Sequence, residues 1–189
     1  MQKYLTLHEF VEEVVNRLKN VVQQYGFVIF DYSTGILYQH HCVFLHFLNI
    51  EDPSNYVFIE IRVGTSFAYV YCIEYRFLNI EDIECVPVAV KFRNCRNLVC
   101  YCYEEFCKNV LTIECVEKLI NIIKKYLSLF GKWKELETTC RTIEKREHEG
   151  FFIGKEDIQK LVNIYKDYIN NKNVMKVLIW LILQFVRCT

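Results

Sequence analysis

The sequence predicts an α+β fold: an N-terminal helix, an antiparallel five- to six-stranded β-meander with duplicated hairpins, and a C-terminal bundle of three to four helices. Three observations support this class. A capping box opens a segment with one apolar face, and a hexapeptide then recurs within a region of alternating hydrophobicity. From about residue 111 the hydrophobic period changes from two to about 3.6 residues, which indicates a switch from strands to helices.

The first helix is predicted over residues 7–25. Thr6-Leu7-His8-Glu9 is a capping box, in which the Thr6 hydroxyl accepts the Glu9 amide hydrogen and the Glu9 carboxylate accepts that of Thr6. Apolar residues then recur at spacings of three and four, and Gly26 follows as a natural left-handed C-terminal residue.

The hexapeptide Phe-Leu-Asn-Ile-Glu-Asp occupies residues 47–52 and returns, letter for letter, at residues 77–82. Apolar runs at 57–63 and 86–92 follow the two copies. Each copy is interpreted as strand, turn, strand. Two copies indicate a tandem pair of hairpins, because a repeat array needs about three or more units to bury a core.

Strand pairing follows from the rule that apolar residues share one face through every strand. A strand at 27–31, a turn at 32–35 and a strand at 36–48 come first. Pairing Phe47 with Val57 then sets Val43 opposite Ile61. The next hairpin is expected to pair Val63 with Phe67, which puts three tyrosines on the core face: Tyr69, Tyr71 and Tyr75.

A strand at 86–93 is expected to follow the second hexapeptide and to pair with the strand before it. Residues 98–103 should pair back on that strand. The polar face of the sheet is expected to collect the following side chains: His40, Cys42, His46, Glu60, Arg62, Cys72, Glu74, Arg76, Lys91, Cys100 and Cys102.

Four helices are predicted after the sheet. Thr112 caps the first, which ends at Gly131 and should cover the sheet. A charged helix at 132–149 is expected to be exposed, and helices at 155–169 and 174–186 follow. Residues 1–110 form the helix plus sheet and residues 111–189 the helical region packed on it, in a single domain overall.

The helix at 174–186 is apolar almost all round. At about thirteen residues it is too short to cross a bilayer, which takes roughly twenty. Burial in the bundle is the favoured interpretation, and a subunit interface is the alternative. One neighbouring surface covers only part of such a helix, so we expect a homodimer formed through it or through an edge strand.

Composition narrows the function classes. Lys plus Arg and Asp plus Glu number 23 each, so no global field attracts the 189-residue chain to nucleic acid or anionic lipid. The N-terminus leads into a helix and not into an apolar signal core, which predicts a cytoplasmic protein. A residue palette encoded by AT-rich codons, with ten cysteines, suggests a virus or mobile element of a hyperthermophile. A virus of a eukaryotic cytoplasm is the alternative source.

The cysteines at 95, 100, 102 and 107 could hold zinc, but their spacing lacks paired Cys-x2-Cys knuckles. Disulfides or buried thiols explain them better. If the source is a hyperthermophile, at least one disulfide is expected, and it should involve the 95–107 cluster. His40, Cys42 and His46 share one strand face, where a transition metal could bind. Ordinary surface histidines are the simpler interpretation. We assign no catalytic residue, cofactor or metal ligand.

Asp52 followed by Glu60-Ile61-Arg62 resembles the metal-binding carboxylates and basic residue of the restriction-endonuclease-like nucleases. The resemblance implies convergence of Asp52 and Glu60 on a divalent metal. This sequence departs from that pattern, because Asp52 lies in a turn and Arg62 replaces the terminal lysine.

The chain contains neither a phosphate-binding loop nor a basic stripe beside its tyrosines. The function expected is therefore that of a non-enzymatic protein-interaction or structural protein, in the viral setting an inhibitor of a host defence complex. A divergent metal-dependent nuclease or a nucleic-acid-binding protein is the alternative.

Overall fold

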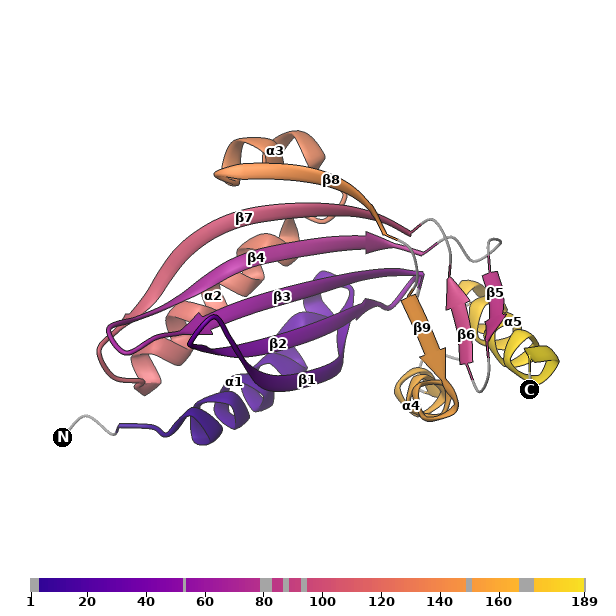
Figure 1. Ribbon diagram of the computed structural model, residues 1–189, viewed down its shortest axis with the longest axis horizontal. Helices are drawn as coiled ribbons and strands as arrows, with labels where there is room; N and C mark the ends of the chain where they lie inside the picture. Colours follow the sequence, from indigo (N-terminus) through magenta and orange to yellow (C-terminus); the bar gives the residue numbers. More distant parts are fainter. Residues whose placement is uncertain are drawn as a thin grey trace.

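The computed structural model describes residues 4–52, 54–78, 83–86, 89–92, 95–148, 151–166 and 172–188. Its main layer is an antiparallel six-stranded sheet in the order β1-β2-β3-β4-β7-β8. Figure 1 shows α1 and α2 together on one face of this sheet. The strands are β1 (Phe27–Leu37), β2 (His40–Asn49), β3 (Asn55–Val63), β4 (Phe67–Phe77), β7 (Cys95–Lys108) and β8 (Thr142–His148).

Helix α1 (Leu7–Val21) begins at the predicted capping box. The Thr6 amide donates to Glu9 Oε2 at 2.8 Å, and the Glu9 amide donates to Thr6 Oγ1 at 3.2 Å. The last turn, Val22–Tyr25, tightens into a 3-10 helix, η1, and Gly26 ends it with φ of 77°. The N-terminal helix is therefore confirmed.

The first hairpin turns later than predicted. Strand β1 runs through the expected turn at 32–35, and the chain reverses at Tyr38 and Gln39, whose φ angles are 48° and 68°. Gly35 serves the strand instead, because a Cβ there would lie 3.4 Å from the Phe44 ring. The predicted turn between residues 31 and 36 was therefore wrong, because β1 continues through these residues.

The register of β2 against β3 is confirmed, with Phe47 opposite Val57 and Val43 opposite Ile61. The predicted register of β4 against β3 was wrong. Ile61 pairs with Val70 and Glu60 with Cys72, so one extra residue, Tyr71, bulges from β4. The alternation shifts there: Val70 and Ile73 enter the core, while Tyr69 and Tyr71 move to the opposite face. Only Tyr75 stays in the core among the three predicted tyrosines.

Strands β5 (Ile83–Val86) and β6 (Ala89–Phe92) do not join the main sheet. With β9 (Phe151–Gly154) they form a separate three-stranded sheet, at one end of the molecule (Figure 1). Strand β4 pairs with β7 in place of the predicted strand at 86–93. Lys91 lies in this second sheet and pairs with Glu84 at 3.9 Å. Residues 79–82 of the second hexapeptide lie outside the described residues, and the duplicated hairpins are not confirmed.

The segment predicted as one charged helix at 132–149 forms a short helix and a strand. Helix α3 (Trp133–Thr139) ends before Cys140, which is disulfide-bonded to Cys100, and β8 then pairs with β7. Ile143 lies opposite Cys100, so the chain turns back on β7 at this point. A charged sequence suits β8 because β8 is an edge of the sheet.

The main core lies between the sheet and the two helices α1 and α2 (Ile113–Ser128). Thr112 caps α2 as predicted, and its apolar stripe is buried. The Tyr75 hydroxyl donates to the Tyr126 carbonyl at 2.9 Å and joins sheet to helix. Cys100 and Cys102 are buried here and not on the polar face, because Cys100 pairs with Ile73 on the core side.

A second core covers one end of the opposite face. Helices α4 (Lys155–Tyr165) and α5 (Lys172–Cys188) pack there on apolar side chains of β1, β2 and β3. The Tyr165 hydroxyl donates to the Asn49 carbonyl at 2.7 Å. The C-terminal helices α4 and α5 thus pack on this part of the sheet, and the expected bundle is not confirmed. Residues 167–169 of the third predicted helix lie outside the described residues.

Helix α5 is not buried all round. Val174, Leu178 and Leu181 point into the second core, whereas the exposed fractions are 47% for Ile179 and 60% for Leu183. Within the described parts of the chain, no helix has the length and apolar character that crossing a membrane requires.

Two disulfides have both partners among the described residues: Cys100–Cys140 and Cys107–Cys115. Each of them includes one cysteine of the 95–107 cluster, so the prediction of a disulfide that involves this cluster is confirmed. The second loop lies inside the first along the sequence. Strand β8, beyond the expected boundary at residue 110, belongs to the sheet that precedes it.

Candidate interaction surface

The face of the sheet away from α1 and α2 carries a patch of tyrosines and arginines that α4 and α5 leave open. We call it the tyrosine–arginine surface. It comprises the following residues of β3, β4, β7 and β8: Glu60, Arg62, Tyr69, Tyr71, Glu74, Arg76, Tyr101, Tyr103, Glu144 and Arg146.

Four rings of this surface contact one another. The centroids of Tyr71 and Tyr103 are 5.2 Å apart, those of Tyr71 and Tyr101 5.6 Å, and those of Tyr69 and Tyr103 6.3 Å. The bulge at Tyr71 and the positive φ of Tyr103, 51°, bring these rings together. A ring cluster held by its neighbours loses little conformational entropy when a partner covers it.

Each arginine of the surface is held by the glutamate two residues before it. Arg62 Nε donates to Glu60 at 2.7 Å, and Arg76 Nε donates to Glu74 at the same distance. Arg146 Nε donates to Glu144 at 2.8 Å. Because residues i and i+2 of a strand share a face, the sequence Glu-x-Arg builds this pair locally on three strands.

The guanidinium groups also stack on aromatic rings. Arg62 lies 3.4 Å from the Tyr71 ring centre, and Arg146 lies 5.8 Å from that of Tyr101. Burial raises the pKa of Tyr71 to about 12, and the hydrogen bond with Tyr103 adds to this. For Arg62, burial lowers the pKa, but the hydrogen bond to Glu60, the charge of Glu60 and the contacts with Tyr71 and Tyr69 together outweigh it, so the pKa is raised. Tyr71 thus stays neutral and Arg62 charged at neutral pH, which suits binding and not proton transfer.

The structure does not bring the nuclease-like residues together. The Asp52 carboxylate accepts hydrogen bonds from the Ser54 amide and hydroxyl and from Asn55 Nδ2, and so closes the turn between β2 and β3. Glu60 lies five residues beyond Asn55 on β3, about 16 Å along the strand. Glu60 is 9% exposed as a whole residue, and its side chain forms an ion pair with Arg62.

The histidine and cysteine candidates have other contacts: the Cys42 thiol donates to the His40 carbonyl at 3.7 Å. His46 contacts the Phe58 ring at 5.0 Å, and Cys42 is fully buried. Cys100 and Cys107 are in different disulfides, and Cys102 is a buried thiol. Within the part of the chain that the structure describes, no three His, Cys, Asp or Glu residues are grouped as a metal site would need.

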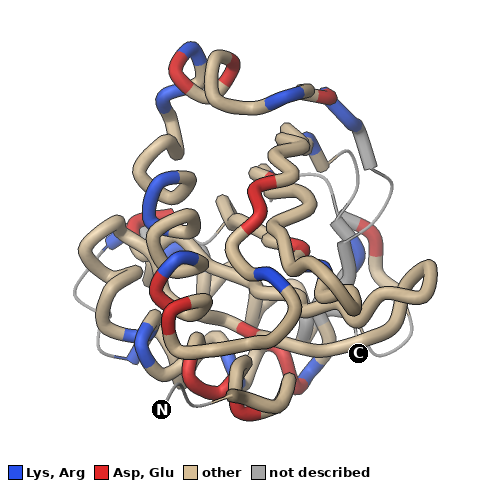
Figure 2. The backbone as a smooth tube through the Cα atoms, turned by 90° about the vertical axis from the view of Figure 1, so that its left-hand side faces the viewer, with Lys and Arg blue, Asp and Glu red and all other residues tan. Residues whose placement is uncertain are grey.

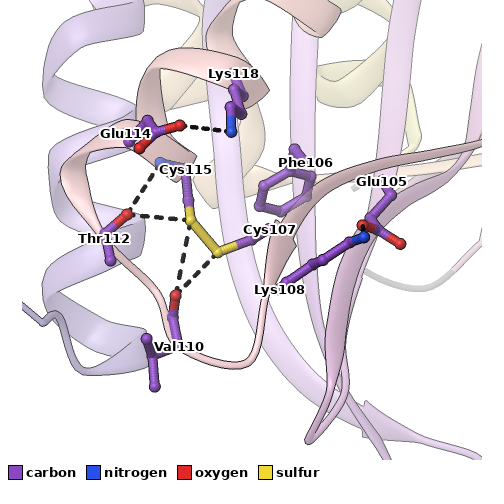
Figure 3. Close-up of a pocket in the computed structure, with 9 residues that line it drawn as sticks. All are labelled: Glu105, Phe106, Cys107, Lys108, Val110, Thr112, Glu114, Cys115 and Lys118. Atoms are coloured by element: carbon purple, nitrogen blue, oxygen red, sulfur yellow. Dashed lines mark hydrogen bonds and ion pairs between the residues drawn. A yellow bond between two sulfur atoms is a disulfide. The ribbon is translucent and has the colours of Figure 1, made fainter.

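A hollow of about 420 Å³ lies where β7 leads to α2. Figure 3 shows the Cys107–Cys115 disulfide in its wall, with Glu114 beside Lys118. Lys108 likewise pairs with Glu105 at 3.5 Å. The charged side chains of this hollow thus neutralise one another, so none of them would select a charged ligand.

Charges of both signs are interspersed over the molecule (Figure 2). The sequence prediction of a charged sheet face at Glu60, Arg62, Glu74 and Arg76 is confirmed, but Tyr101 and Tyr103 were missed. The three Glu-x-Arg triplets at 60–62, 74–76 and 144–146 were a sequence signal for the ion pairs of this surface.

Comparison with protein-family models, with curated proteins and with solved structures finds no match.

Proposed function

We propose that this is a non-enzymatic protein-interaction protein, and that its partner docks on the tyrosine–arginine surface. Tyrosine and arginine dominate the residues that contribute most to protein–protein binding. Here they form one patch, with rings and guanidinium groups already positioned by mutual contacts. Occupying a partner's surface is also how an inhibitor of a host defence complex would act, and we propose the host cytoplasm as its location.

The observation that carries this proposal is the pairing of each surface arginine with a glutamate. A nucleic-acid surface needs cations that are available to phosphates. On this face, Arg62, Arg76 and Arg146 each already bind a carboxylate. The patch therefore offers stacking area without net positive charge, which favours a protein partner over a nucleic acid.

The test compares two double variants. Tyr71→Ala/Tyr103→Ala removes rings from the surface, and Tyr4→Ala/Tyr32→Ala removes exposed rings elsewhere. Affinity capture from host lysate with quantitative mass spectrometry should recover a partner with the wild type and the control, but not with the surface variant. That partner, once purified, should bind at least about tenfold more weakly to the surface variant.

The same proteins are titrated with labelled single-stranded DNA and RNA, with Mg²⁺ and Mn²⁺ present. DNA or RNA binding that is lost in Tyr71→Ala/Tyr103→Ala would show that the partner of this surface is a nucleic acid and not a protein. Cleavage that disappears in Glu60→Ala would show a metal-dependent nuclease. Either result would overturn the proposal.

We further propose a homodimer formed through α5. Its exposed apolar stripe consists of Ile179, Ile182, Leu183 and Val186, at the spacing of one helix face. Two copies of one stripe can pack across a twofold axis, since each presents the same surface.

A further inference from the structure

A second hollow, of about 620 Å³, lies between α3 and the ends of β4, β7 and β8. Its volume falls within the range of small-molecule sites, about 300–1,000 Å³. It is on the core side of the sheet, because its wall residues Phe77 and Leu98 share the face that Tyr75 occupies. Of the tyrosine–arginine surface, Arg146 also lines this hollow.

The wall of this hollow is aromatic and held in place. The Phe77 and Trp133 rings meet edge to face at 5.6 Å, and Trp133 also contacts Phe130 at the same distance. Helix α3, which carries Trp133, is tied to β7 through the Cys100–Cys140 disulfide directly after its last residue. The apolar wall is thus preformed and can receive a flat apolar group.

The rim of the hollow is cationic. Arg96 lies opposite Phe77 across β4 and β7, and Lys145 lies opposite Leu98 across β7 and β8, so both stand on the face of the hollow. Neither makes an ion pair with any residue that the structure describes. Among the described residues that line the hollow, the acidic one is Glu137. Arg146 also lines the hollow but is paired with Glu144, so Arg96 and Lys145 against Glu137 leave a net positive rim, unlike the self-neutralised hollow of Figure 3.

We propose that this hollow binds a small organic anion with a flat aromatic part, such as an aromatic carboxylate. The aromatic group would pack on Phe77 and Trp133, and the anionic group would reach Arg96 and Lys145. Rings supply the apolar contact, and the two cations supply the selection for charge.

Matched probes test the proposal on the full-length oxidised protein. Calorimetry compares 2-naphthoate with the uncharged 2-naphthamide, which has the same ring system. We expect 2-naphthoate to bind with a Kd of about 1 mM or tighter. The amide should bind about fivefold more weakly. Fluorescence of Trp133 in a Trp180→Phe background places the probe at the hollow.

Three variants separate this site from others. Arg96→Gln/Lys145→Gln should weaken 2-naphthoate about fivefold and leave 2-naphthamide unchanged. Glu137→Gln should strengthen 2-naphthoate, a gain that misfolding cannot imitate. Lys108→Gln/Lys118→Gln, at the hollow of Figure 3, is the control and should change neither. Equal binding of the two probes, equal binding to all variants, or no binding at millimolar concentration would each overturn the proposal.

Discussion

The guanidinium carbon of Arg62 lies 3.4 Å from the centre of the Tyr71 ring while its Nε donates to Glu60 at 2.7 Å. This ion pair is therefore partly shielded from water by an aromatic ring. The side chains of Glu60 and Arg62 are 12% and 14% exposed, against 45% and 40% for Glu144 and Arg146. The Glu-x-Arg pair thus occurs in a shielded environment at Glu60–Arg62 and in an open one at Glu144–Arg146.

Glu60→Ala is expected to lower the free energy of unfolding by about 3 kcal/mol, because it leaves Arg62 charged and poorly hydrated. The matched change Glu144→Ala should cost less than about 1 kcal/mol, since water replaces the lost partner. Urea denaturation of both variants measures the difference.

The double variant Glu60→Leu/Arg62→Leu supplies the control. Removing both charges leaves nothing unpaired, so it should recover most of the stability that Glu60→Ala loses. Equal losses for Glu60→Ala and Glu144→Ala would show that the aromatic shielding has no energetic effect.

Stability should fall in mild acid because of His46. Burial, and next the charge of Arg76, lower the pKa of His46 to about 4 from 6.5. Between these values the unfolded chain binds a proton that the folded protein does not, so the contribution present above pH 6.5 is lost as pH falls towards 4. The loss amounts to about 3 kcal/mol.

The pH dependence is measured by urea denaturation from pH 7 to pH 4. Carboxylates titrate over the same range, so the wild type is compared with His46→Leu at every pH. The difference between the two should shrink or reverse as pH falls. A constant difference would contradict the role assigned to His46.

Thiol titration in denaturant without reductant should find at most six thiols. The chain has ten cysteines, and the two disulfides with both partners described use four of them. Ten reactive thiols would refute both bonds. Disulfides of this kind persist in oxidising compartments and in the cytosol of hyperthermophiles.

The two disulfides should contribute unequally. Cys100–Cys140 closes a separation of 40 residues and Cys107–Cys115 one of 8. On loop-closure entropy, Cys140→Ser should cost about 4 kcal/mol and Cys115→Ser about 2.5 kcal/mol. Thermal denaturation of the two variants gives the order, and the reverse order would contradict the entropic account.

The intact protein should be a dimer at micromolar concentration in light scattering. Ile179→Glu/Leu183→Glu should give a folded monomer, because these positions are exposed and the second core does not need them. Leu178→Glu is the contrast, since Leu178 is 6% exposed, and it should unfold the C-terminal region. A monomeric wild type would refute the dimer.

What the sequence predicts well is what periodicity and capping determine locally. Helix α1 follows from the Thr6 capping box, and the pairing of β2 with β3 follows from placing Phe47 opposite Val57. Both rest on side chains within a few residues of one another or on a single register choice.

The errors have non-local causes. One inserted residue, Tyr71, reverses the alternation in β4, and no neighbouring residue announces it. The charged residues of β8 favour a helix on their own, and the contacts with β7 override that preference. For the candidate surface, the sequence supplied the Glu-x-Arg pairs, but the tyrosines of β7 joined them only through the pairing of β4 with β7.

Residues 109–112 link β7 to α2, and Val110 in this link is 49% exposed. A protease such as trypsin can cut this link after Lys108. The pieces would still be joined twice, by Cys107–Cys115 and by the surrounding Cys100–Cys140. A singly nicked molecule would therefore migrate as one chain on a non-reducing gel and separate only after reduction. Nesting one cross-link inside another lets the protein survive such a cut as a single covalent unit.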